Sequence, residues 1–274
     1  MTHKSILSDK EVDSILAYIR RNKSVDLASY RRTFVVRRLS GRMENVSAET
    51  GGAYLNILRD DPEEFGRFLE TLSINVTGFF RDPGVFEFLQ KAVLPEFIRK
   101  KKAAGRRIMR IWSAGCASGE EPYSIAIMAR GITGDDPGFE VAVHATDIDT
   151  AALKRAQEAV YPGSSLGNAG KKVLEKYFTP VYNGEYLLKD EIKKSVHFKR
   201  QNLISDPVLK HMDMVFCRNM MIYLSTEEKD SLIGKFNESL NTGGYLVVGK
   251  VESVWNNRGF ETVSTTNKVY RKTV

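Results

Sequence analysis

In the first part of the chain, apolar side chains recur every three or four positions, the spacing that places them on one face of a helix. The clearest run consists of Val12, Ile15, Leu16 and Ile19. Just before it, Ser8 followed by Glu11 is the capping-box pattern that starts a helix. We see no alternating strand pattern here, so residues 1–72 are predicted to form an all-helical domain.

From about Gly105 the pattern changes to short apolar runs that alternate with helical stretches. The runs predicted to be strands cover residues 108–112, 141–145, 212–217 and, after a predicted turn at 241–244, residues 245–248. The stretches predicted to be helices cover residues 123–130, 151–160 and 226–240. Strands separated by helices run parallel through right-handed crossovers, so this part is predicted to be an α/β domain with a mostly parallel sheet.

Residues 161–195 interrupt this alternation. Pro162 and several glycines indicate a loop, and Asn183-Gly184 lies between two short strand-like runs. Asn-Gly in such a position is the strongest local signal for a β-hairpin. We therefore predict a second domain over residues 73–274 that carries a small antiparallel β-subdomain at about residues 161–195.

The chain has a net charge of +7, and one segment accounts for all of it. Residues 20–43 hold eight lysines and arginines against the single carboxylate of Asp26, so the rest of the chain is balanced. A local excess of this size predicts a contact surface for a negatively charged partner.

A predicted basic helix near residues 29–43 orders part of this charge. At about 100° per residue, three arginines share one stripe, namely Arg31, Arg38 and Arg42. Three apolar residues share another stripe, namely Val36, Leu39 and Met43. We expect the apolar stripe to pack inward and the arginine stripe to face outward toward the partner. The alternative is an ordinary solvated charged face.

The composition is that of a globular protein, with 42% hydrophobic residues and no apolar run near the ~20 residues of a membrane span. The first residues lack the pattern of a signal peptide, so a cytoplasmic location is expected. Cys116 and Cys217 are far apart in the chain. We expect two reduced thiols, and their spacing does not suggest a metal site.

Small residues follow the first predicted strand, from Ser113 to Gly119. At the carboxyl end of a parallel strand, such a turn lets a ligand approach the backbone closely. Asp147 follows the second strand, where a carboxylate can accept hydrogen bonds from both hydroxyls of a ribose. The alternative is a helix-capping role for Asp147 or Asp149, and we expect Asp149 to cap and Asp147 to bind.

Two further polar clusters are candidate site residues. Arg218 and Asn219 follow the strand at 212–217 and therefore fall at the same edge of the sheet. The alternative for Arg218 is a salt bridge at the domain seam. The segment that joins the two domains holds Asn75, Thr77 and Arg81. The alternative there is a helix start capped by Asp82 ahead of Pro83, with the neighbouring phenylalanines in the core.

Four motifs in this order resemble those of the chemotaxis receptor glutamate methyltransferases, the CheR family. They are Asn-x-Thr-x-Phe-Phe-Arg at residues 75–81, Trp-Ser-Ala-Gly-Cys-Ala-Ser-Gly-Glu-Glu-Pro-Tyr-Ser at 112–124, Asp-Ile-Asp at 147–149 and Phe-Cys-Arg-Asn-x-x-Ile-Tyr at 216–223. The resemblance covers nearly the whole chain. It implies a class I S-adenosylmethionine-dependent methyltransferase sheet of the Rossmann-like type, with an N-terminal helical domain and a β-subdomain.

The resemblance also implies roles. The cofactor would be S-adenosylmethionine, the product S-adenosylhomocysteine, and the substrate glutamates in the cytoplasmic helical domain of chemotaxis receptors. The implied cofactor-binding residues are Asn75, Thr77, Arg81, Glu121, Asp147, Asn202, Leu203, Arg218 and Asn219. Arg81 and Tyr223 would lie nearest the transferred methyl group, and the arginine stripe would face the receptor. We expect no metal, no nucleic acid, no membrane insertion and a monomer.

The chain departs from the family pattern in two places. Gly249-Lys250-Val251-Glu252 stands where the family often has Gly-His-Ser-Glu, so any role of that histidine is in doubt. The hairpin at Asn183-Gly184 is short. Some relatives use a longer loop there to hold a peptide at the receptor's C-terminus, so we predict that this chain does not need that tether.

The chemistry of a glutamate substrate agrees with the residues in these motifs. Its carboxyl has a reference pKa near ~4.3, so it is ionised and nucleophilic at neutral pH and needs no general base. We expect Arg81 to orient it through paired N–H donors and Tyr223 to donate a hydrogen bond. Two alternatives stay open, a nucleic-acid methyltransferase that grips phosphates with its basic helices and a non-catalytic adaptor that only binds the cofactor.

Overall fold

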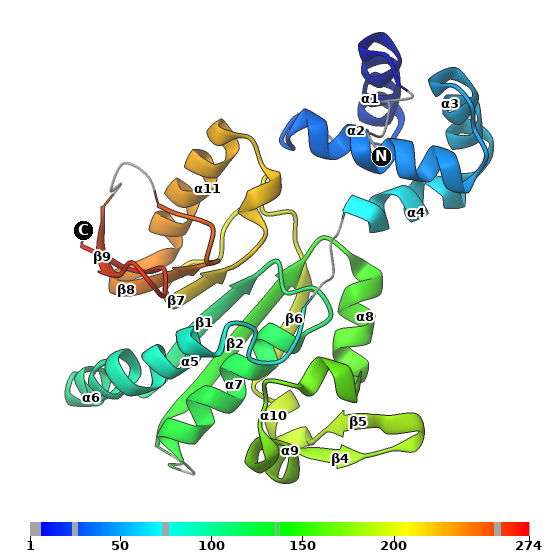
Figure 1. Cartoon of the computed structure of the whole chain (residues 1–274). Coiled ribbons are helices and arrows are strands. Elements are labelled where there is room, and N and C mark those ends of the chain that lie inside the picture. The colour runs from blue at the N-terminus through cyan, green and yellow to red at the C-terminus, as the bar shows by residue number, and fades with distance from the viewer. Residues whose placement is uncertain are drawn as a thin grey trace. The chain divides into compact units, whose positions relative to one another are not determined.

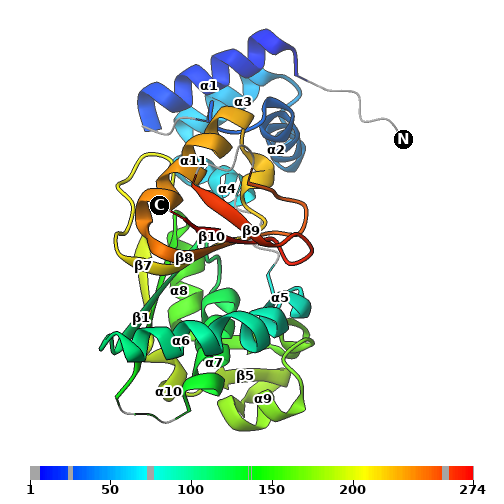
Figure 2. The same ribbon diagram turned by 90° about the vertical axis from the view of Figure 1, so that its left-hand side faces the viewer.

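The computed structural model describes residues 7–23, 27–72, 77–134, 136, 138–254 and 259–273. The chain divides into two compact units. The helical unit combines Met1–Ile74 with Tyr223–Lys229, and the sheet unit combines Asn75–Ile222 with Asp230–Val274. Figures 1 and 2 show the elements of each unit from two sides. In the described part of the chain, no helix has both the length and the apolarity needed to cross a bilayer.

Four helices make up most of the helical unit, as predicted. They are α1 (Asp9–Lys23), α2 (Arg32–Asn45), α3 (Gly51–Asp60) and α4 (Pro62–Leu72). The capping box forms before α1, where the Ser8 amide donates to Glu11 Oε2 at 2.9 Å. Thr50 caps α3 by accepting from the Ala53 amide at 3.1 Å. These caps satisfy amides that would otherwise lack a partner at the helix starts.

The apolar stripes of these helices meet in one core. Side chains with no exposed surface include Ile15, Ile19, Leu39, Met43, Tyr54, Leu58 and Phe68. A distant segment joins the unit through a short antiparallel bridge between Tyr30 and Leu224. The Arg31 amide donates to the Tyr223 carbonyl at 2.9 Å, and the Ser225 amide donates to the Ser29 carbonyl at 3.0 Å. Residues 223–229 therefore belong structurally to the helical unit.

The sheet unit is built on seven strands in the order β6-β2-β1-β7-β8-β10-β9. The first five are parallel to their neighbours, namely β6 (Val196–Arg200), β2 (Glu140–Asp147), β1 (Ile108–Ala114), β7 (Met212–Cys217) and β8 (Leu240–Val248). The last two, β10 (Val269–Lys272) and β9 (Phe260–Ser264), are antiparallel. The predicted α/β architecture with a mostly parallel sheet is confirmed.

Helices flank this sheet (Figure 1). The three predicted ones are α7 (Glu120–Thr133), α8 (Thr150–Glu158) and α11 (Thr226–Ser239). A further helical run, not predicted from the sequence, consists of α5 (Pro83–Phe88), a π-helical turn (Leu89–Val93) and α6 (Leu94–Ala103). The short helices α9 (Lys171–Tyr177) and α10 (Asp190–Lys193) belong to the region between α8 and β6.

The predicted antiparallel insertion is present between α8 and β6. It is a sheet of three strands in the order β3 (Val160–Pro162), β5 (Glu185–Leu188) and β4 (Phe178–Pro180). Asn183 and Gly184 turn the chain between β4 and β5 with positive φ angles of 58° and 74°. Asn and Gly adopt such angles more readily than other residues, which is why this dipeptide marked the hairpin.

The predicted turn at residues 241–244 is wrong in its detail. These residues belong to β8, whose register against β7 shifts between Met212 and Met214. Gly243 has a φ of 78°, and a Cβ on Gly244 would lie 2.9 Å from the Asp213 carbonyl. The two glycines therefore form an irregular start of the strand, and the strand continues through it.

Candidate active site

The carboxyl end of β1 passes into α7 through a tight turn of small residues. The Gly115 and Cys116 amides both donate to the Thr146 carbonyl at the end of β2, at 2.8 and 3.0 Å. Gly119 has a φ of 97°, and a Cβ there would lie 2.8 Å from the Tyr161 hydroxyl. Only a residue without a side chain fits this position, so the backbone of the turn stays close to the end of β2.

Asp147 at the end of β2 holds this turn in place. Its Oδ2 accepts from the Ala117 amide at 2.8 Å, and its Oδ1 accepts from the Asp149 amide at 2.9 Å. Burial raises the pKa of Asp147, although these backbone donors oppose the rise. Asp149 caps α8 as expected, because its Oδ1 accepts from the Ala152 amide at 3.0 Å. A carboxylate has room for about four hydrogen bonds, so Asp147 can still accept two.

Arg218, just after β7, lies in a buried ion-pair cluster. Its Nη2 donates to Asp82 Oδ2 at 2.7 Å and to the Arg81 carbonyl at 3.1 Å, and its Nη1 donates to Glu121 Oε2 at 3.3 Å. The Ser113 hydroxyl donates to the other oxygen of Glu121 at 2.8 Å. The alternative from the sequence was a salt bridge at the domain seam; the observed salt bridge forms within the sheet unit. A contact of Arg218 with a cofactor stays a prediction.

Burial raises the pKa of Glu121 and outweighs the opposing effect of Arg218. Its side chain is 14% exposed. The cluster joins the segment before α5 to the starts of α7 and of the loop after β7. Three of the four family motifs thus meet in one set of polar contacts within the sheet unit.

The segment before α5 is docked through its phenylalanines. The Phe79 amide donates to the Ser165 carbonyl at 2.9 Å, and the Phe80 amide donates to Ser124 Oγ at 2.9 Å. The Phe79 ring meets the Tyr161 ring edge to face, with centroids 4.9 Å apart. Phe79 is buried in the core and Phe80 packs against it, as the alternative interpretation of this segment expected.

Asp82 does not cap α5, so this part of the alternative interpretation is wrong. It has a left-handed φ of 58° and makes no side-chain cap bond, although Pro83 begins the helix. Its carboxylate is used by Arg218 and by Lys250, whose Nζ lies 2.9 Å from Asp82 Oδ1. Thr77 is partly buried in this segment, and Asn75 lies outside the described residues.

Asn202 and Leu203 follow β6 at the same edge of the sheet. Asn202 shapes its own loop, because its Oδ1 accepts from the Ile204 amide at 3.0 Å and its amide donates to Asp206 Oδ2 at 2.9 Å. Leu203 is buried. The neighbouring Gln201 is also buried, and its Oε1 has no hydrogen-bond partner among the described residues. An unpartnered buried acceptor at a ligand-binding edge is available to a ligand donor.

Glu252 is a site residue whose importance the sequence did not establish. Its carboxylate accepts from the amides of Asn219, Ile222 and Gly249 at 2.9, 3.2 and 2.6 Å. Asn219 takes a left-handed φ of 61° in this loop, and a Cβ on Gly249 would lie 2.6 Å from Glu252 Oε2. Glu252 thus ties the loop after β7 to the turn after β8. In the sequence, the feature that could have indicated this role is Gly249, three residues before Glu252.

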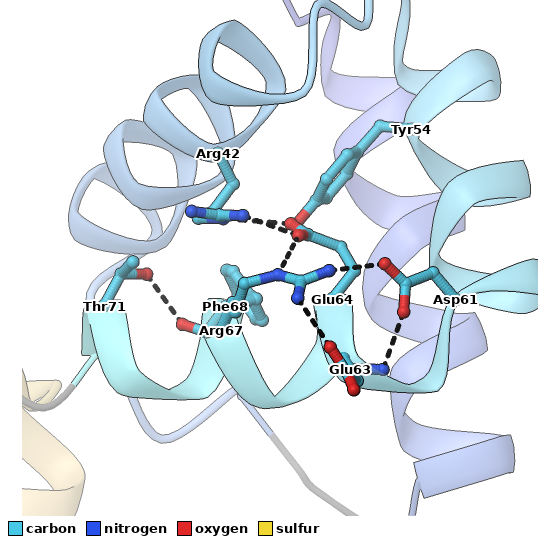
Figure 3. A network of polar contacts seen from close by, with 8 residues as sticks. All are labelled: Arg42, Tyr54, Asp61, Glu63, Glu64, Arg67, Phe68 and Thr71. Atoms are coloured by element: carbon cyan, nitrogen blue, oxygen red, sulfur yellow. Dashed lines mark hydrogen bonds and ion pairs between the residues drawn. The ribbon is translucent and has the colours of Figure 1, made fainter.

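Arg42 does not face outward, which corrects the prediction for the arginine stripe. Its Nε and Nη2 donate to the two oxygens of Glu64 at 2.9 and 2.5 Å, and Glu64 has no exposed surface (Figure 3). Tyr54 and Arg67 donate to the same carboxylate at 2.9 and 3.2 Å. A buried carboxylate needs such partners, and Arg42 is the cation within reach on α2.

The other two arginines of the stripe differ from each other. Arg31 is exposed and donates to the Leu224 carbonyl at 3.3 Å. Arg38 is partly buried and lies over the Phe34 ring, 5.2 Å from its centroid. Arg37 on the same helix is exposed. The exposed cations at this helix are therefore Arg31 at its N-cap, Arg32, which pairs with Asp9 and Asp13, and Arg37, with Arg38 half-covered.

Tyr223 belongs to the helical unit, whereas Arg81 belongs to the sheet unit. The Tyr223 ring packs on the Phe34 ring with centroids 4.7 Å apart. Its backbone carbonyl accepts from the Arg31 amide. Tyr223 is thus fixed on the start of the basic helix, and its catalytic role stays a prediction.

A parallel sheet with an acid at the end of its second strand, small residues after its first and an antiparallel pair at one side defines a class I S-adenosylmethionine-dependent methyltransferase. The family described as "CheR methyltransferase, SAM binding domain" matches residues 75–269, and "CheR methyltransferase, all-alpha domain" matches residues 10–73. The chain belongs to the CheR methyltransferase family, and the predicted family, fold class and cofactor are confirmed.

Proteins with the name "Chemotaxis protein methyltransferase" are similar over most of this chain. The one from Borreliella burgdorferi is 31% identical over 260 residues, which cover 93% of this chain and 92% of that protein. The one from Listeria monocytogenes is 32% identical over 256 residues, which cover 93% of this chain and 94% of that protein. The one from Salmonella typhimurium is 32% identical, with 93% and 88% covered.

Proposed function

We propose that this protein transfers a methyl group from S-adenosylmethionine to glutamate side chains in the cytoplasmic helical domain of chemotaxis receptors. The products are a glutamate methyl ester and S-adenosylhomocysteine. The observation that carries this proposal is the match of both parts of the chain to one methyltransferase family, together with the acidic strand end that suits a nucleoside. The relatives described above carry the name chemotaxis protein methyltransferase.

The residues at the strand ends fit an adenosine group. Asp147 keeps two acceptor positions for a ribose diol, and the buried Gln201 Oε1 is an acceptor without a partner in the described chain. The hydroxyls and the amino group of adenosine are donors, so the two sides are complementary. We assign the same pocket to Thr77, Glu121, Asn202, Leu203, Arg218, Asn219 and the undescribed Asn75.

The bound cofactor supplies an electrophilic methyl group on a positively charged sulfur. The chain's own task is to align a glutamate carboxylate with it, and alignment of two reactants can lower a barrier by ~7–11 kcal/mol. We assign the orienting contact to the Arg81 guanidinium and a hydrogen bond to the Tyr223 hydroxyl. Glu121 and Asp82 hold Arg218 against the Arg81 carbonyl, which fixes the backbone that carries Arg81.

We assign receptor recognition to the outer cations of α2. The assignment keeps Arg31 at the N-cap of the helix and the half-covered Arg38, and adds the exposed Arg37. Arg42 acts indirectly, because it fixes α2 through Glu64. Positive charge on this helix complements clustered glutamates on a receptor helix and sets their register. We further propose a cytoplasmic monomer that needs neither nucleic acid nor membrane insertion.

The experiment is incubation of the protein with methyl-labelled S-adenosylmethionine and purified receptor cytoplasmic domains, with and without their C-terminal tails. We expect label on receptor that mild base releases as methanol, to the same extent with both forms of the receptor domain. Arg81→Ala should reduce transfer strongly, and Arg81→Lys should recover only part of it. Base-stable label on RNA, or cofactor binding without transfer to any receptor, would overturn the proposal.

A further inference from the structure

A cavity of about 280 Å³ lies at the amino end of the sheet, between α6 and the irregular start of β8. Asp213 at the amino end of β7 and Gly243 at the start of β8 line it. The candidate active site lies at the carboxyl ends of the same strands, so the cavity belongs to the opposite edge. Its volume is near the lower limit of small-molecule sites, about 300 Å³.

Four cations and two carboxylates line the cavity, namely Lys100, Lys101, Arg106 and Arg271 with Glu96 and Asp213. One pair of these is used to build the wall. Lys101 Nζ lies 2.5 Å from Asp213 Oδ2, and both residues are buried. Asp213 also accepts from the Arg110 amide at 2.8 Å and from Asn241 Nδ2 at 3.0 Å. Lys101 and Asp213 therefore neutralise each other. The other charged residues of the lining are three cations and Glu96, which leaves an excess of two positive charges.

The remaining cations are held loosely and stay accessible. Lys100 pairs with Glu96 at 2.7 Å, and both side chains are more than half exposed. Arg271 pairs with Glu261 at 3.3 Å on the surface. Arg106 is exposed and makes no ion pair with any residue that the structure describes. Exposed pairs of this kind contribute little stability, so they exchange readily for a better anion.

Two observations indicate that these charges converge on the inside of the cavity. Burial raises the pKa of Tyr245 in the wall, and the fields of Arg271 and Lys100 act in the opposite direction on the same phenol. A Cβ on Gly243 would lie 3.7 Å from Arg271 Nη2. Because Gly243 has no side chain, this position of the strand leaves the guanidinium uncovered.

We propose that this cavity binds the phosphate group of a ligand, with Arg106 and Arg271 as its main donors. A phosphate monoester carries a charge of about −1.5 to −2 at pH 7, which matches the two excess positive charges of the lining. Planar guanidinium groups bind phosphate oxygens in pairs, which suits this group better than a chloride or a single carboxylate. The group belongs to a small soluble compound or to a lipid headgroup.

The test titrates the full chain with sodium pyrophosphate by calorimetry at low salt, and separately with phosphatidylcholine vesicles that contain or lack phosphatidic acid. Wild type should bind at least one of these probes, and Arg106→Ala with Arg271→Ala should weaken that binding at least tenfold. Arg59→Ala removes one charge from an exposed position in the helical unit, as many as Arg106→Ala or Arg271→Ala removes alone, and should have little effect. Arg271→Lys keeps the positive charge but lacks the planar guanidinium with its paired donors. Its affinity should lie between that of wild type and that of the double variant.

The two probes separate the two sources. Saturation by pyrophosphate identifies a soluble phosphate compound, and binding only to vesicles with phosphatidic acid identifies a headgroup. S-adenosylmethionine affinity should be unchanged in the double variant, which shows that the sheet unit remains folded. Equal binding by wild type and the double variant, an equal loss in Arg59→Ala, or no binding of either probe would overturn the proposal.

Discussion

Glu64 in the helical unit and Glu121 in the sheet unit are both largely buried glutamates beside an arginine, yet their pKa values shift in opposite directions. Burial alone would raise the pKa of Glu64, but hydrogen bonds from Arg42, Tyr54 and Arg67 outweigh it and lower the value. For Glu121, burial outweighs the attraction of Arg218, and the pKa is raised.

The difference separates a completed charge cluster from an incomplete one. Glu64 has a donor on each oxygen and more than one arginine, so its ionised form is well stabilised in the folded unit. Glu121 has one long contact from Arg218 and one hydroxyl, and the Arg218 Nε is buried without a partner in the described chain. An environment of this second kind gains from additional polar groups, which a bound ligand can supply.

The largest expected effect is on the completed cluster. Glu64→Ala leaves the cations of Arg42 and Arg67 without their shared anion, and we expect a loss of about 3–5 kcal/mol in the free energy of unfolding of the helical unit. Chemical denaturation measures it. Glu63→Ala removes an exposed partner of Arg67 and should cost less than about 1 kcal/mol. Equal losses in the two variants would contradict the comparison.

The pH dependence of this loss follows from the lowered pKa of Glu64. The stabilisation is complete above the ordinary glutamate pKa of about 4.3 and disappears as pH falls through the lowered folded value. The difference between wild type and Glu64→Ala should therefore shrink in acid. A difference that grows as the pH falls would show that the ionised form of Glu64 is not what stabilises the unit.

The incomplete cluster should respond in ligand binding as well as in stability. Arg218→Ala leaves Asp82 and Glu121 without their common cation, and we expect a loss of about 2–3 kcal/mol in stability. S-adenosylmethionine affinity, measured by calorimetry, should fall at least tenfold, because the segment that carries Arg81 loses its anchor. Arg218→Lys retains the charge but cannot bridge both carboxylates, so it should recover stability better than affinity.

The sequence predicted the kind of each periodic element but not the charge clusters. The strand at 212–217 and the helix after Asp149 were predicted within a residue or two, because apolar periodicity and capping are local signals. The pairing of Arg42 with Glu64 depends on how α2 packs against α4, and no local pattern records it. The arginine stripe was therefore assigned to the surface although one of its members is an internal partner.

At the site, the strand-end residues were predictable and their connections were not. Asp149 caps α8 as expected, and Asp147 lies at the end of β2, where an acid was predicted to bind a ribose; that binding role stays a prediction. The contribution of Glu252 depends on the backbone from Asn219 to Ile222, which turns back toward its carboxylate. That turn requires the left-handed conformation of Asn219, which a sequence pattern does not show.

A smaller effect is expected at Asp147, where burial also raises the pKa. Ribose hydroxyls donate to the ionised carboxylate, so S-adenosylmethionine affinity should fall as pH is lowered through this raised pKa. Asp147→Asn should weaken binding about tenfold at neutral pH, or about 1.4 kcal/mol, and remove the pH dependence. Asp149→Asn keeps the helix cap and is the matched control, with binding like wild type in calorimetry from pH 5 to 8.

The smallest effect is expected at Lys250, which reaches the incomplete cluster from the surface through Asp82. Its side chain is 61% exposed, so Lys250→Ala should cost no more than about 1 kcal/mol and lower kcat/KM less than fivefold. Lys250→His places at this position the residue common in the family, which carries a charge only below its pKa of about 6.5. Relative to Lys250→Arg, its kcat/KM should therefore be restored at pH 6 and reduced at pH 8. A profile parallel to that of Lys250→Ala would show that the charge at residue 250 does not act on the cluster, and that Arg218 and Glu121 are positioned without it.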